Sequence, residues 1–177
     1  ELARAGLGRV LTIGLAAGAV TGVLTALGQA YGLLDSDLLS LSRAPGGTFG
    51  NRNFVAHLAA ISLPVLLATA LAARSRAGYF VSVLATLLTV GLMVLTRSRA
   101  AWLGTALSGL VFLGRGFLPG GLWRDETARK RVRGPILAVI AGAALALSLP
   151  NALDWRSDTP YIDTLKGLTN YQEGSGR

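Results

Sequence analysis

The sequence has no cysteine, a single histidine and few charged residues. The absence of cysteine excludes a disulfide framework and any thiolate metal site. Charged residues make up only 15% of the 177 residues, whereas soluble domains average about 25%. This scarcity of charge argues against a soluble enzyme and against a nucleic-acid-binding domain.

The sequence instead contains long runs of hydrophobic residues without charge. Hydrophobic residues account for 51% of the chain, and its mean hydropathy is +0.51. A helix needs about 20 predominantly apolar residues to cross a bilayer. The sequence therefore predicts an all-α, polytopic transmembrane bundle over residues 1–150, with five spans at about 10–34, 54–73, 79–96, 100–118 and 135–149.

The basic residues are divided unevenly between the two sides of this predicted bundle. The side with the N-terminus holds ten basic and three acidic residues, a formal charge of +7, and the other side holds seven and six, a formal charge of +1. Cytoplasmic connections carry an excess of Lys and Arg. We therefore place the N-terminus and a basic loop predicted over 116–134 in the cytoplasm. The net charge of +8 then reflects membrane topology, so no nucleic-acid partner is expected.

Residues 151–177 are polar and of mixed charge, and they fall on the outer side in this topology. We expect them to begin a large outer loop that is truncated in this chain. The first residue is not Met, and no signal-peptide cleavage pattern follows it. The chain is therefore expected to be a piece of a longer protein.

Three glycines of the first apolar run, Gly14, Gly18 and Gly22, fall four residues apart and share one face of a helix. Small residues at this spacing let a second helix approach closely. Glycine is also frequent in membrane spans generally. Both interpretations remain open from the sequence.

A glycine-rich segment, Gly-Thr-Phe-Gly-Asn-Arg-Asn at residues 47–53, precedes the second span on the outer side. Asn51 or Asn53 is a candidate N-cap for that span, because a side-chain oxygen there accepts from free backbone amides of the first turn. A cap accounts for one asparagine, not for two that flank an arginine. The alternatives are a simple capped turn and the floor of a polar pocket.

Arg97 and Arg99 lie in a very short outer turn, where they oppose the general charge distribution. Arginine near lipid is costly unless it is paired or functional. A guanidinium fork binds phosphate oxygens through two parallel hydrogen bonds. The pair is therefore a candidate phosphate site, and the alternative is that both side chains extend to lipid headgroups.

Taken in order, three segments resemble the O-antigen ligase and polymerase family, which includes bacterial protein O-oligosaccharyltransferases. They are Gly-Thr-Phe-Gly-Asn-Arg-Asn-Phe-Val-Ala at 47–56, Ser-Arg-Ala-Ala-Trp at 98–102 and Gly-Ser-Gly-Arg at 174–177. The resemblance covers the chain from about residue 40 to its end. It rests on the order, spacing and side of the three motifs together.

The resemblance implies a glycosyltransferase of the bacterial inner membrane that needs no metal or other cofactor. It would move a glycan from an undecaprenyl-diphosphate carrier to a glycolipid, glycan or protein acceptor on the periplasmic face. Arg99 and Arg177 would contact the diphosphate, and Arg97 lies beside the first of them. Arg52 stands where the family usually has proline or a similar residue, and it is a candidate third contact. The histidine that activates the acceptor is expected beyond this chain, while His57 is expected to be buried and hydrogen-bonded.

The rival interpretation is part of a lipid or solute transporter, such as a flippase. Transporters show broken helices or ionisable groups near the middle of the bilayer. The predicted spans contain no ionisable group deeper than His57, which favours an enzyme acting at the membrane surface. A purely structural membrane scaffold is a third alternative.

The predicted topology can be tested by single-cysteine labelling, since the chain has no native cysteine. In intact cells, a membrane-impermeant thiol reagent should label Ser42→Cys and Ser157→Cys. It should label Ser75→Cys only after lysis, because the charge distribution places that turn in the cytoplasm. Labelling of Ser75→Cys in intact cells would reverse the orientation.

Overall fold

The computed structural model describes residues 2–35, 44–118, 121, 126–153, 155 and 158–167. In these residues the chain forms six α-helices and one short 3-10 helix and no β-strand. The elements are α1 (Leu2–Ala30), η1 (Gly47–Phe49), α3 (Arg52–Leu71), α4 (Arg76–Thr96), α5 (Arg99–Phe117), α6 (Glu126–Ser148) and α7 (Pro160–Lys166).

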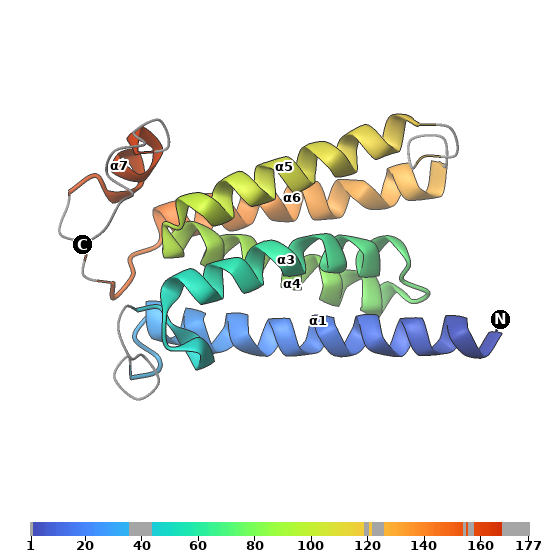
Figure 1. The fold of residues 1–177 in the computed structure, drawn as a ribbon, viewed down its shortest axis with the longest axis horizontal. Coiled ribbons are helices and arrows are strands. Elements are labelled where there is room, and N and C mark those ends of the chain that lie inside the picture. Colours follow the sequence, from blue (N-terminus) through green and yellow to red (C-terminus); the bar gives the residue numbers. More distant parts are fainter. Residues whose placement is uncertain are drawn as a thin grey trace.

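Five of these helices, all except α7, are long and apolar enough to cross a membrane. The predicted all-α bundle is therefore confirmed, and the chain has the character of a multi-pass membrane protein. The long helices alternate in direction (Figure 1). The start of α1, the α3–α4 turn, the end of α5 and the start of α6 lie at one end of the bundle, and η1, the α4–α5 turn and α7 lie at the other (Figure 1).

Helix α4 lies at the centre of the packing together with α3, because each of the two contacts α1, α5, α6 and the other. Its apolar side chains Leu92 and Leu95 are fully buried, and so are the polar side chains of Thr86 and Thr89. The two threonine hydroxyls donate to carbonyl oxygens one turn earlier in α4, at 2.8 and 2.7 Å. A threonine that satisfies its own hydroxyl in this way can be buried without a partner from another helix.

Helices α4 and α6 approach each other closely where Gly91 and Gly142 face each other. A Cβ at Gly142 would collide with the Leu87 carbonyl of α4, and one at Gly91 would lie 3.4 Å from the Gly142 carbonyl. In the first span, only Gly22 meets another element, with Leu58 of α3 beside it, while the space next to Gly14 and Gly18 is open. Close packing at glycine therefore occurs mainly between α4 and α6, and of the three glycines considered in the first span it involves only Gly22.

The first span ends earlier than predicted, at Ala30 instead of residue 34. Gly32 adopts a left-handed conformation, with φ of 70°. The Leu33 amide then donates to the Gly28 carbonyl at 2.7 Å, and the Gly32 amide donates to the Gln29 carbonyl at 3.2 Å. This pair of bonds is a Schellman motif, which closes a helix at a glycine.

The largest departure from the prediction concerns α6, which begins at Glu126 and contains Pro135. The sequence had placed a basic loop over 116–134 and started the fifth span at Pro135. Proline lacks the amide that would bond the carbonyl four residues earlier, here that of Arg131. The Tyr79 hydroxyl of α4 donates to this carbonyl instead, at 2.8 Å.

Gly134 makes room for this replacement bond. A Cβ at that position would overlap the Tyr79 hydroxyl. The Arg131 side chain contributes on the same side, because its Nη1 donates to the carbonyls of Leu71 and Ala73 at the end of α3, at 3.0 and 2.8 Å. The helix therefore continues through the Gly-Pro pair because a neighbouring helix satisfies the carbonyl that the proline leaves free.

A double-mutant cycle tests this replacement bond. Tyr79→Phe should lower the free energy of unfolding in detergent by about 1–3 kcal/mol, because the Arg131 carbonyl loses its donor. Pro135→Ala restores a backbone amide for the same carbonyl. Tyr79→Phe should therefore cost much less in a Pro135→Ala background, and strictly additive effects would show that the two positions do not share this carbonyl.

Candidate functional site

The α4–α5 turn is a two-residue reversal formed by Arg97 and Ser98. Arg97 has φ of 54° and is the only non-glycine residue with a positive φ in the described part of the chain. Its amide donates to the Val94 carbonyl at 3.1 Å. The left-handed conformation costs a non-glycine residue about 1–2 kcal/mol. Such strain clusters at functional sites, and here it brings Arg97 and Arg99 to the same end of the bundle.

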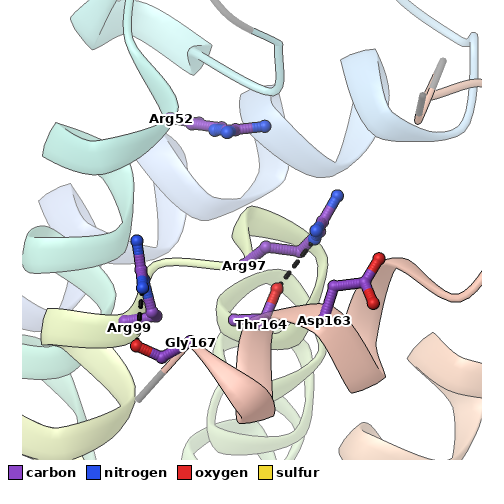
Figure 2. Close-up of a pocket in the computed structure, with 6 residues that line it drawn as sticks. All are labelled: Arg52, Arg97, Arg99, Asp163, Thr164 and Gly167. Atoms are coloured by element: carbon purple, nitrogen blue, oxygen red, sulfur yellow. Dashed lines mark hydrogen bonds between the residues drawn. The ribbon is translucent and has the colours of Figure 1, made fainter. Parts of the chain in front are cut away.

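Both arginines of this turn reach α7 and the residue that follows it. Arg97 Nε donates to Thr164 Oγ1 at 2.9 Å. Arg99 Nη1 donates to the Gly167 carbonyl oxygen at 2.6 Å (Figure 2). The segment that contains α7 is thus fixed directly to the turn between two of the long apolar helices.

Arg52 joins the cluster from α3, of which it is the first residue. Its guanidinium carbon lies 5.3 Å from the ring centre of Trp155, and that of Arg97 lies 4.8 Å from the same ring. A cation over an aromatic face within about 6 Å is attracted to the ring. Trp155 therefore holds two guanidinium groups near each other that would otherwise repel.

The three arginines line a cavity of about 180 Å³ at this end of the bundle. Figure 2 shows Arg52 on one side of it and α7 on the other, with Arg97 and Arg99 between them. The lining is polar and carries three guanidinium groups against one carboxylate, a formal net charge of +2. It consists of Arg52, Arg97, Arg99, Asp163, Thr164 and Gly167.

The tyrosine of α7 adds a neutral hydroxyl to the same region. Burial is the main cause that raises the pKa of Tyr161, and nearby Tyr31 raises it further, while Arg97 lowers it. The phenol therefore remains protonated at neutral pH, where it can donate a hydrogen bond. The positive charge of the site rests on the arginines alone.

Three of the four arginines predicted from the sequence meet at this cavity. Arg52 comes from α3, and Arg97 and Arg99 come from the α4–α5 turn. Arg177 lies outside the described residues. The structure thus supports a shared site for three of these residues, and no observation bears on the fourth.

The two asparagines shape the entry to α3 and do not line this cavity. Asn51 is the N-cap, and its Oδ1 accepts from the Asn53 amide at 2.9 Å. The Asn53 side chain itself is exposed. The capped turn is therefore the role that the structure supports, and it sets the position of Arg52 at the first turn of the helix.

His57 is exposed, so the expectation of a buried, hydrogen-bonded histidine was wrong. The reason is its place on α3. The buried face of that helix includes Val55, Ala59 and Leu66, and residue 57 falls on the outer face beside the exposed Phe54 and Ile61. His57 is not among the residues that line the arginine cavity.

Trp155, Asp163 and Thr164 were not singled out from the sequence. The segment was interpreted only as polar and of mixed charge, although Thr159-Pro160 marks a helix start, since proline favours the first helical position. That signal predicts α7. No local signal predicts that Trp155 would lie against arginines so distant in the chain.

No group of three or more metal-ligating side chains occurs in the part of the chain that the structure describes. Comparisons with protein-family models, with curated proteins and with solved structures gave no match. The function is therefore inferred from the residues of the site and from the resemblance in their sequence pattern.

The cap at Asn51 gives a prediction with its own matched control. Asn51→Ala should reduce the free energy of unfolding by about 1 kcal/mol, because the Asn53 amide loses its acceptor. Asn53→Ala should have little effect, since only its backbone takes part in the cap. Unfolding of both purified variants in the same detergent measures the difference, and equal losses would mean that Asn51 is not the effective cap.

Proposed function

We propose that this chain is the membrane-embedded part of a glycosyltransferase of the O-antigen ligase and polymerase type. It would bind an undecaprenyl-diphosphate-linked glycan, and the acceptor would be a glycolipid, a glycan or a protein. The observation that carries the proposal is the convergence of Arg52, Arg97 and Arg99 on one polar cavity at an end of the bundle.

The chemistry of the cavity suits a diphosphate better than a single carboxylate or a neutral sugar. A diphosphate presents several negatively charged oxygens, and guanidinium groups bind such oxygens through paired hydrogen bonds. Arg99 donates one hydrogen bond, from Nη1 to the Gly167 carbonyl, and a guanidinium has five N–H donors in all. Donors therefore remain for a ligand while α7 stays in place.

The position of the cavity suits a lipid-linked substrate. It opens at the level where α3, α4 and α5 begin or end, so a diphosphate there can keep its polyprenyl chain beside the apolar helices. Exposed apolar side chains on α5 close to the turn, such as Leu103 and Leu107, provide a surface for that chain. Binding at the bilayer surface avoids moving the charged group into hydrocarbon, which is costly.

The proposed orientation places this end of the bundle in the periplasm and the N-terminus in the cytoplasm of a bacterial inner membrane. The support is the excess of basic residues at the opposite end, which follows the distribution of cytoplasmic connections. The residue that activates the acceptor is expected outside the described part. The chain would thus supply carrier binding, with Arg177 as a further contact to the diphosphate.

The decisive variant is Arg99→Ala. A hydrogen bond to a charged group contributes about 1.5–3 kcal/mol, so carrier use should fall by roughly 10- to 100-fold. Arg99→Lys retains the charge but loses the paired geometry, and it should also be impaired. The measurement is glycan transfer from undecaprenyl diphosphate by the protein that contains this chain, in membranes with matched amounts of each variant.

Arg115→Ala is the matched control, because Arg115 is an exposed arginine in the last turn of the same helix, at the opposite end of the bundle. It should leave transfer unchanged. Near-normal transfer by Arg99→Ala would reduce Arg99 to an anchor at the lipid surface. If the reconstituted protein moves the lipid carrier across a vesicle membrane but transfers no glycan, the transporter alternative is favoured.

A further inference from the structure

A second and larger cavity, of about 440 Å³, lies at the opposite end of the bundle from the arginine site. One wall is α1, through Thr12 and Ile13, and the other is the end of α3 with the turn that leads to α4. We call it the α1–α3 groove. It lies between two helices long and apolar enough to span a membrane, so in a bilayer the groove would face the lipid of one leaflet.

Three of the four hydroxyl groups that line this groove donate within their own helices, and the fourth, that of Ser75 next to Arg74 in the turn, accepts from the Gly78 amide at 3.0 Å. Thr12 donates to the Gly8 carbonyl at 2.8 Å, Thr69 to the Leu66 carbonyl at 2.8 Å, and Ser82 to the Gly78 carbonyl at 2.9 Å. A hydroxyl bonded in this way offers no donor to a ligand. Together with Ile13 and Ala72, these residues therefore form a wall suited to a hydrocarbon chain.

The single charged residue in the lining is Arg74, at the mouth of the groove in the α3–α4 turn. Its side chain is exposed, and the structure shows no hydrogen bond or ion pair for it among the described residues. The neighbouring Arg131 guanidinium donates to the Ala73 carbonyl at 2.8 Å, which adds a second positive charge beside the mouth. The groove thus combines an apolar interior with a cationic entrance.

We propose that the α1–α3 groove binds an anionic phospholipid, with an acyl chain along the groove and the phosphate at Arg74. Basic pockets between membrane helices recognise anionic headgroups in this way. Charge complementarity selects this occupant over a second copy of the chain. A copy in the same membrane orientation would bring its own basic turn to the same depth, where like charges repel. The proposal does not depend on the proposed transferase activity.

The test uses the purified chain in lipid nanodiscs that contain photoactivatable phosphatidylglycerol or phosphatidylcholine with identical acyl chains. After irradiation, mass spectrometry locates the labelled peptides. Phosphatidylglycerol should label the groove at residues 12–13 and 68–73 about tenfold more than phosphatidylcholine. Arg74→Gln should lower labelling by phosphatidylglycerol to the phosphatidylcholine level, because one charge-assisted bond accounts for about that factor.

Two further variants separate a built site from general surface charge. Arg76→Gln removes a neighbouring exposed arginine that does not line the groove, and it should leave labelling of the groove unchanged. Ala72→Phe narrows the groove at an exposed position and should reduce labelling there by both lipids. Equal labelling of the wild-type groove by the two lipids would overturn the proposal. Equal losses in Arg74→Gln and Arg76→Gln, or crosslinks between two chains through α1, would also do so.

Discussion

Every backbone amide and carbonyl inside a bilayer needs a hydrogen-bond partner within the protein, because hydrocarbon supplies none. This requirement explains why the long apolar runs are helices, and it also explains how their ends are finished. Asn51 and Ser75 accept from the free amides that follow them. Arg131 donates to the last carbonyls of α3. Polar side chains placed at helix ends thus allow the bundle to reverse direction in short turns.

The short α4–α5 turn brings charged side chains together at one end of the bundle. Helix α4 is held on several sides by its neighbours, so the position of its last residue is well defined. The next three residues place two guanidinium groups at the membrane surface, and α3 begins close by with Arg52. The polar segment after α6 then contacts Arg97 through Trp155 and Thr164. A rigid apolar bundle therefore positions a charged site that no single helix could form.

The sequence predicted the number of spans and their order, because hydrophobic length is the dominant signal in a membrane protein. The resemblance of its motifs also implied that Arg52 and Arg99, with Arg97 beside them, belong to one site. The sequence placed the start of the fifth span wrongly, since Pro135 indicates a break when it is considered alone. The helix continues through Pro135 because the Tyr79 hydroxyl donates to the Arg131 carbonyl, a tertiary contact that the local sequence does not reveal. The contacts of Trp155 could not be predicted from the sequence either, because they join segments that are far apart in the chain.

The arrangement around Pro135 has a consequence for how this sequence can change over time. Tyr79 supplies a donor, Gly134 leaves the space for it, and Pro135 creates the need for it. A helix with an ordinary residue at 135 would satisfy the Arg131 carbonyl itself, and then neither a hydroxyl at 79 nor a glycine at 134 would be required. The three positions should therefore be inherited as a unit across related chains. In a related chain that lacks the proline, the tyrosine and the glycine would both be free to change as well.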